Sequence, residues 1–361
     1  MIGAMRVMLA GATAAAMMAA AGGGWTHLSS RKGELPVPGE SHEQTGALVA
    51  KIDPRGRATD FVLSFRQKAP ALVWYRRQGK GWSRYVIEKE FLTVEAGGTA
   101  YDIDGDGDLD VVFGGDYQSS QLWWWENPAP RFDPAVSWKR HVIKDGGARQ
   151  HHDQIFADLK GTGKPQLVFW NQGAKTLYLA EIPADPRNSG PWPLEVIFSG
   201  KAGEQVENAA QYAEGLDVSD VDGDGRLDLL AGNSWFRYEG GGRFRPVRIG
   251  TIGGRIKAGK FHPGRYPQIV IAPGDGSGPL KFYECAGDPG KPESWRGGIC
   301  WARTWCTGIR STWAMWMVME IWTSLPPRWR NGERSRSRRM RRRRLGSCMA
   351  MARAAFERPC W

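Results

Sequence analysis

The sequence predicts an all-β fold, a β-propeller of four-stranded blades, and three observations lead to this prediction. A nine-residue loop recurs along the chain at intervals of 40 to 62 residues. A short β-branched or apolar run, typical of a buried strand, follows each copy of the loop. Helical patterns longer than ten residues are absent beyond the N-terminal segment, and 47 Gly and 22 Pro indicate a chain rich in turns.

The N-terminal segment has the pattern of a secretory signal. Residues 1–21 carry one early charge, Arg6, then a small and apolar run that ends in Ala19-Ala20-Ala21. This run is too short and too rich in alanine for a membrane span. We therefore expect an exported protein, periplasmic or secreted, with a signal peptide at 1–21, a linker at 22–44 and no membrane span after cleavage.

The repeated loop divides residues 45–296 into five readable units. The loops begin at Asp53, Asp102, Asp158, Asp220 and Lys260. Each is entered by one predicted strand and followed by a second, at 61–63, 111–113, 167–169, 229–231 and 269–271. An aromatic strand follows in every unit, and a fourth strand is readable at 82–87, 138–143, 192–197 and 244–249. Four strands in about 50 residues make one propeller blade.

Two of the loops have the ligand pattern of a calcium site. Asp102–Asp110 and Asp220–Asp228 share aspartates at positions 1, 3, 5 and 9 and glycines at positions 4 and 6. Calcium binds six to eight oxygen ligands, and alternate carboxylates on a tightly turning loop converge on one point. The sequence thus predicts two calcium sites; the alternative is a pair of acidic turns that stay solvated.

The other three loops lack this pattern, and no metal is assigned to them. The loop from Asp158 keeps the glycines but has lost the acids, and the loop from Lys260 carries His262 and Gln268 instead. Asp53–Asp60, aligned on its first acid, is one residue short. We expect these loops to close through backbone hydrogen bonds without metal.

The units resemble FG-GAP/VCBS-type repeats, the calcium-loop blades of integrin-like and many exported bacterial β-propellers. The residues that carry the resemblance are Asp102–Asp110 and Val112-Phe-Gly-Gly115, and the resemblance covers residues 45–295. It implies ligation by the side chains of Asp102, Asp104, Asp106 and Asp110 with the carbonyl of Asp108. In the second loop it implies Asp220, Asp222, Asp224 and Asp228 with the carbonyl of Arg226.

The C-terminal segment 297–361 has a different composition and reads as an out-of-frame tail. It contains fourteen Arg, three Glu and no Lys or Asp, so it supplies the whole net charge of +11. The codons of Met315–Thr323, shifted by one nucleotide, permit a third acidic loop. We infer a scrambled sixth unit in a parent of six to eight blades. A genuine arginine-rich arm is the alternative; without the tail, the charge balance offers no reason to expect nucleic-acid binding.

Charged or ionisable residues near the start of the first strand in four of the five units form a second candidate site. In a propeller these positions lie near one mouth of the central channel, and here they are Glu95, His151, His152, Glu214 and Arg255. Imidazole and carboxylate groups suit Zn²⁺ or another divalent ion, or a general base. The alternative is a set of polar residues bonded to one another and to water. Trp123, Trp124 and Trp125 could stack on a sugar, but core packing is the favoured interpretation.

Two functions remain open from the sequence. The first is an exported calcium-binding propeller that binds carbohydrate or an extracellular protein ligand. The second is a metal-assisted lyase or hydrolase acting on sugars at the channel mouth, through His151 or His152 with Glu95, Glu214 and Arg255. The oligomeric state is left open.

Overall fold

The computed structural model describes residues 27–56, 59–200, 214–274 and 278–299. The predicted signal peptide, the scrambled loop near residue 315 and the arginine-rich segment lie outside these ranges. The described residues group into two compact units, one within Met1–Asp158 and Gly163–Ser199, the other within Leu159–Thr162 and Gly200–Trp361. They contain no α-helix, and no helix among them could cross a membrane.

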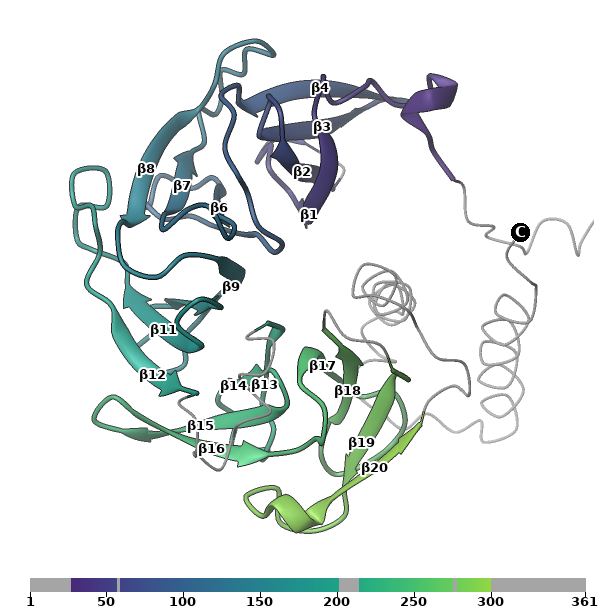
Figure 1. Cartoon of the computed structure of the whole chain (residues 1–361), viewed down its shortest axis with the longest axis vertical. Helices are drawn as coiled ribbons and strands as arrows, with labels where there is room; N and C mark the ends of the chain where they lie inside the picture. Colours follow the sequence, from purple (N-terminus) through teal and green to yellow (C-terminus); the bar gives the residue numbers. More distant parts are fainter. Residues whose placement is uncertain (1–26, 57–58, 201–213, 275–277, 300–361) are drawn as a thin grey trace, which may run out of the picture. The chain divides into compact units, whose positions relative to one another are not determined.

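The first unit contains three four-stranded antiparallel sheets, each formed by consecutive strands (Figure 1). A 3₁₀ turn, η1 (Ser30–Lys32), precedes them. The strands are β1 (His42–Ala50), β2 (Asp60–Gln67), β3 (Leu72–Gln78) and β4 (Gly81–Glu88); β5 (Thr99–Tyr101), β6 (Asp110–Gly114), β7 (Leu122–Glu126) and β8 (Lys139–Lys144); β9 (His151–Ala157), β10 (Gln166–Asn171), β11 (Thr176–Glu181) and β12 (Glu195–Ser199).

The second unit contains two sheets of the same kind. Their strands are β13 (Leu216–Ser219), β14 (Asp228–Ala231), β15 (Ser234–Gly240) and β16 (Arg243–Arg248); β17 (Gly254–Gly259), β18 (Gln268–Pro273), β19 (Lys281–Cys285) and β20 (Trp295–Ile299). A 3₁₀ turn, η2 (Pro292–Ser294), leads into β20. This strand extends three residues into the segment that the sequence assigned to the tail.

The five sheets confirm the predicted β-propeller-like fold. Each is a meander in which neighbours in sequence are neighbours in the sheet, as in a propeller blade. The repeated nine-residue loop joins the first and second strands of every sheet, as the sequence predicted. The apolar runs after the loops are the second strands, and β6, β10, β14 and β18 are buried along their whole length.

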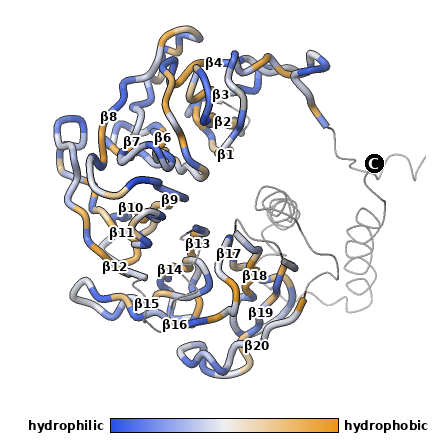
Figure 2. The backbone as a smooth tube through the Cα atoms, viewed as in Figure 1, coloured by the Kyte–Doolittle hydropathy of each residue, from blue (hydrophilic) through white to orange (hydrophobic). Residues whose placement is uncertain are grey.

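The hydrophobic core lies between successive sheets of a unit. Trp74 of the first sheet packs near Trp125 and Trp138 of the second, and a similar cluster between β13–β16 and β17–β20 contains Trp235 and Trp295. Backbone hydrogen bonds also join the sheets, such as the one from Trp138 N to Ile87 O at 2.9 Å. Figure 2 shows that the start of β9, by contrast, is strongly hydrophilic.

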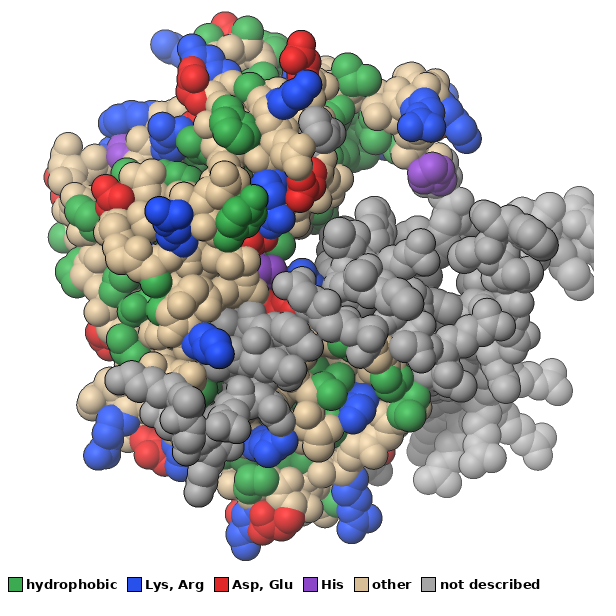
Figure 3. Space-filling view, in the orientation of Figure 1, with side chains coloured by type: hydrophobic (Ala, Val, Ile, Leu, Met, Phe, Trp, Pro, Cys, Tyr) green, Lys and Arg blue, Asp and Glu red, His purple; other side chains and the backbone are tan. Residues whose placement is uncertain are grey.

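Charges of both signs are interspersed on the face of the described residues seen in Figure 3. The three tryptophans at 123–125 are all buried, and Trp124 stacks on His141 with ring centroids 4.2 Å apart. The prediction of core packing is therefore confirmed, and stacking of these rings on a sugar is excluded.

Candidate metal loops and a buried charge cluster

The last residue of the loop closes it in four sheets by accepting a backbone hydrogen bond. Asp110 accepts from Ile103 N at 3.0 Å and Asp228 from Val221 N at 3.0 Å. Gln268 does the same for Phe261 N at 2.8 Å, although its loop has no calcium pattern. Loop closure therefore uses a side chain rather than backbone groups alone, in loops with and without the calcium pattern.

The same hydrogen bond corrects the alignment of the first loop. Asp60 accepts from Asp53 N at 3.4 Å, so Asp53 occupies the second position of its loop, where Ile103 stands in the second sheet. The loop is therefore of full length, and the carboxylate of Asp53 forms an ion pair with Arg76 instead of facing a metal. The sequence alignment matched the first acid and so missed this shift by one residue.

Loop 1, residues 102–110, brings three carboxylates together. Oxygens of Asp102, Asp104 and Asp106 all lie within 4.8 Å of one another. Asp102 itself is oriented by the N–H groups of Gly105 and Gly107, at 2.9 and 3.1 Å. Both glycines have positive φ, 77° and 96°, a backbone conformation that residues with a Cβ rarely adopt.

Two further aspartates of loop 1 are buried. Asp110 accepts hydrogen bonds on both oxygens, from Ile103 N and Asn127 N, and lies outside the carboxylate trio. Burial raises its pKa to about 8. Burial and the charges of Asp106, Asp104 and Asp102 raise the pKa of Asp108 to about 7. Both carboxyl groups are therefore harder to ionise in the folded loop than in an unfolded chain.

Loop 2, residues 220–228, repeats this geometry in the second unit. Oxygens of Asp220, Asp222 and Asp224 again lie within 4.8 Å of one another. Gly223 N and Gly225 N orient Asp220, at 2.7 and 3.0 Å. Burial raises the pKa of the closing residue, Asp228, to about 6.

The residues of both loops fit a hard divalent cation. Each trio offers oxygen ligands only, which is the donor set of calcium rather than of zinc. In loop 1, the buried Oδ1 of Asp108 accepts no hydrogen bond from any described residue. A cation would compensate such an atom, because a buried carboxylate oxygen without a partner is costly.

The sequence-predicted Glu95 belongs to a buried charge cluster in the first unit. Arg66, from β2, lies 2.5 Å from Glu95 Oε1 and 3.3 Å from Asp116 Oδ2. The side chain of Glu95 is 4% exposed, and that of Asp116 is fully buried. Gln150 donates to the second oxygen of Glu95 at 3.2 Å. One guanidinium thus balances two buried carboxylates.

The predicted histidines lie next to this cluster but are both buried. His151 is fully buried with Nε2 3.3 Å from Asn171 Nδ2, and burial lowers its pKa to about 3. It is therefore neutral near neutral pH. His152 Nδ1 lies 2.9 Å from Asp153 Oδ2. Among the described residues, the groups of three or more acids, histidines or cysteines close enough to hold a metal are the two aspartate trios.

Glu214 and Arg255 lie in the second unit and pair with each other. Arg255 Nη2 is 3.5 Å from Glu214 Oε2, and the side chain of Glu214 is fully buried. Of the five predicted residues, Glu95 therefore pairs with Arg66 in the first unit, and Glu214 pairs with Arg255 in the second.

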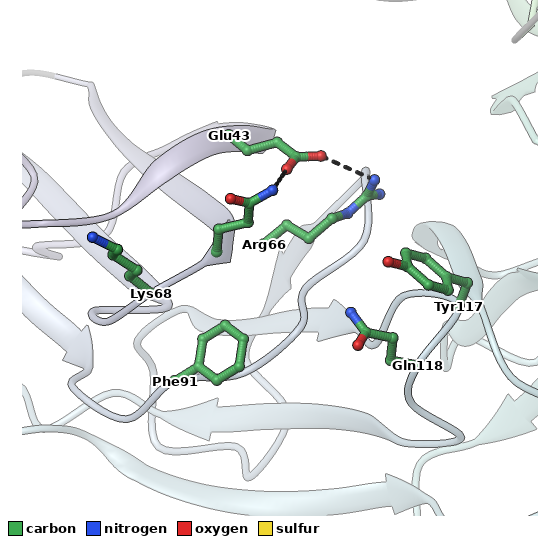
Figure 4. Close-up of a pocket in the computed structure, with 7 residues that line it drawn as sticks. Glu43, Arg66, Lys68, Phe91, Tyr117 and Gln118 are labelled. Atoms are coloured by element: carbon green, nitrogen blue, oxygen red, sulfur yellow. Dashed lines mark hydrogen bonds and ion pairs between the residues drawn. The ribbon is translucent and has the colours of Figure 1, made fainter.

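A pocket of about 370 Å³ opens beside Arg66 in the first unit. Figure 4 shows its lining, with Phe91 and Tyr117 on different connections. Both rings are exposed, 53% and 59%. Glu43, Gln67, Lys68 and Gln118 supply the polar groups.

Two residues that line this pocket have a backbone conformation that residues with a Cβ rarely adopt. Five non-glycine residues of the described chain have positive φ, and Glu43 (62°) and Lys68 (59°) line the pocket. Gln150 (71°), which bonds to Glu95, and Asp153 (46°) are two more. Strain of this kind costs about 1–3 kcal/mol per residue and clusters at functional sites. Sequence reasoning missed the pocket because its residues come from four separate segments.

Comparisons with known proteins give similarity in structure alone. No family model matches the chain, and no curated protein matches it. The exotype rhamnogalacturonan lyase YesX is 16% identical with a TM-score of 0.42, over 71% of this chain and 51% of the lyase. The V. cholerae biofilm matrix protein Bap1 is 14% identical with a TM-score of 0.44, over 69% and 39%.

YCF48 from Cyanidioschyzon merolae is 14% identical with a TM-score of 0.37, and the match covers 73% of each chain. The chain spans about half the length of the lyase and about two fifths of Bap1. At these identities and TM-scores the comparisons describe a similarity of backbone fold and assign no ligand to this chain. The FG-GAP/VCBS resemblance rests on the loops themselves.

Proposed function

We propose that this protein is an exported, calcium-stabilised β-propeller-like module that binds carbohydrate. The observation that best supports calcium binding is that the same trio of carboxylates occurs in both units. Asp102, Asp104 and Asp106 in one and Asp220, Asp222 and Asp224 in the other each place their oxygens within 4.8 Å. Like charges held this close destabilise the loop unless a cation lies among them.

Calcium titration of chelator-treated, desalted protein tests this proposal. We expect two ions per chain, one for each loop. Asp104→Asn is expected to leave one site, and so is Asp222→Asn, because each substitution removes a charge from one trio. Asp133→Asn serves as a matched control, because this exposed aspartate lies outside both loops and accepts a hydrogen bond from Ala135 N that asparagine can also accept. Absence of calcium binding by the wild-type chain would overturn the proposal.

The pocket beside Arg66 supports the binding part. Sugar rings stack on exposed aromatic faces, and amide, carboxylate and ammonium groups bond their hydroxyls. Phe91 and Tyr117 provide the faces, and Gln67, Lys68 and Gln118 provide polar groups nearby. A volume of about 370 Å³ is at the small end of the range for ligand pockets, about 300–1,000 Å³. It suits one or two sugar residues.

An array of immobilised neutral and acidic oligosaccharides, probed with the calcium-loaded protein, tests the pocket. Tyr117→Ala and Phe91→Ala are each expected to weaken any binding about tenfold, since a lost aromatic contact is worth about 0.5–1.5 kcal/mol or more. Val196→Ala is the control, because Val196 is equally exposed, at 58%, but lies on β12 away from the pocket lining. Sugar binding that survives both aromatic substitutions would contradict this assignment.

A further inference from the structure

The third strand of each sheet places a charged residue opposite the last residue of the loop. In the third sheet the pair is direct, since Gln166 pairs with Glu181. In the second sheet Val111 pairs with Trp125, so the next residues outward, Asp110 and Glu126, stand opposite each other. The same register identifies the third-strand residue that stands opposite the last residue of the loop in every sheet. In chain order these residues are Arg76, Glu126, Glu181, Arg237 and Glu284. We term each of these the facing residue of its sheet.

In four sheets the facing residue complements a group of the loop region. Arg76 forms an ion pair with Asp53, and Arg237 Nη2 lies 3.1 Å from Asp222 Oδ2. In the fifth sheet the facing residue is a carboxylate, and Nε2 of His262 in the loop lies 2.7 Å from Glu284 Oε1. Glu181 accepts a hydrogen bond from Gln166 at 3.3 Å.

The second sheet departs from this rule. Its facing residue is the carboxylate Glu126, and the loop opposite is itself acidic. Arg187, from the connection between β11 and β12, bridges the two, with Nε 3.1 Å from Glu126 Oε1 and Nη2 2.7 Å from Asp104 Oδ2. The five aspartates of loop 1 and Glu126 make six carboxyl groups, and two cations lie beside them, Arg187 and Lys139, whose Nζ is 3.6 Å from Glu126 Oε2. Around loop 2, four carboxylates share two guanidinium groups, those of Arg226 and Arg237.

We propose that the facing residue sets the calcium affinity of its loop, so that Glu126 makes loop 1 the tighter site and Arg237 makes loop 2 the weaker one. This inference rests on the proposed calcium binding. A unit charge about 6 Å from a divalent cation changes its affinity by about tenfold, even at the dielectric constant of water. Arg187 adds to this effect of Glu126 on the calcium affinity of loop 1. If Glu126 is lost, the guanidinium of Arg187 neutralises only Asp104 and Asp106, which lowers the affinity further.

Calcium isotherms measured on chains with one working loop test the proposal. Asp222→Asn disables loop 2 and isolates loop 1, and Asp104→Asn isolates loop 2. On these backgrounds we expect loop 1 to bind more tightly. Glu126→Gln is expected to weaken loop 1 about tenfold, and Arg237→Gln to tighten loop 2 about tenfold. Glu239→Gln is the matched control on β15, because Glu239 is exposed and pairs with Arg245; it should change neither affinity more than twofold, about 0.4 kcal/mol.

The two substitutions act in opposite directions, which separates an electrostatic effect from general damage to the fold. An unchanged or raised affinity of loop 1 in Glu126→Gln would overturn the proposal, and so would a lowered affinity of loop 2 in Arg237→Gln. If both isolated loops bind calcium but the facing residues change neither affinity, the inference fails while the proposed function stands. If neither loop of the wild-type chain binds calcium, both fail.

Discussion

Replacement of Arg66 by methionine is expected to lower the free energy of unfolding by about 3–5 kcal/mol, the usual cost of removing one partner of a buried ion pair. Arg66 is the cation that balances Glu95 and Asp116, whose side chains are 4% and 0% exposed. Methionine preserves much of the apolar stem but leaves two carboxylates without a counter-charge. Urea denaturation followed by tryptophan fluorescence measures the difference.

Two further variants separate the loss of charge from other effects. Lys139→Met removes an exposed cation that lies 3.6 Å from Glu126, and it should cost less than about 1 kcal/mol. Adding Glu95→Gln and Asp116→Asn to Arg66→Met should restore part of the stability, because the uncompensated charges are gone. A loss below about 1 kcal/mol in Arg66→Met would show that water already solvates this cluster.

Removal of calcium is expected to destabilise both units. At a free calcium concentration 100 times the dissociation constant, each occupied loop contributes about 2.7 kcal/mol. Differential scanning calorimetry with a chelator and with saturating calcium measures the change. The double variant Asp104→Asn with Asp222→Asn should show no calcium-dependent shift, and identical melting of the wild-type chain in both conditions would refute the expectation.

The pH dependence of the chelated protein follows from the same carboxylates. The pKa of Asp108, about 7, and that of Asp110, about 8, exceed the value of about 3.9 in an unfolded chain. Between these values the folded state binds more protons than the unfolded state, so the stability falls as the pH rises. We expect the melting temperature in chelator to decrease from about pH 5 to about pH 8, and calcium to reduce this slope. A slope unaffected by calcium would disagree with this account.

The repeated strands and loops could be predicted from the sequence because each is a local pattern. Apolar runs after Asp110 and Asp228 fall on β6 and β14, and the loop residues that form each trio lie within five positions of one another. The pocket could not be predicted in this way. Phe91 and Tyr117 sit in connections with no pattern of their own, and only the pairing of sheets in space brings them together.

The charge partners were missed for a related reason. Arg66 reads as one polar residue in a half-exposed strand, and nothing near it in sequence identifies Glu95 and Asp116 as its partners. Glu126 follows three tryptophans, and the pattern of this segment indicates only that those tryptophans are buried in a strand. Its role depends on the register between β6 and β7, which no single-strand pattern records. The closing residue was missed as well, although it leaves a signal in the sequence: Asp or Gln recurs at the ninth position in every copy once the first loop is realigned on Asp60.

The hydrogen bond that closes each loop does not depend on whether the loop carries the acidic residues of a calcium site. Asp60 and Gln268 hold their loops shut by the same contact as Asp110 and Asp228, although only the latter pair belongs to acidic loops. The three positions that form the carboxylate trio in two of the loops can therefore carry other residues while the closing contact of the loop is kept. Repeated units on one scaffold can therefore differ in the chemistry of their loops, and the described units include acidic loops as well as loops with basic or neutral residues at the same positions.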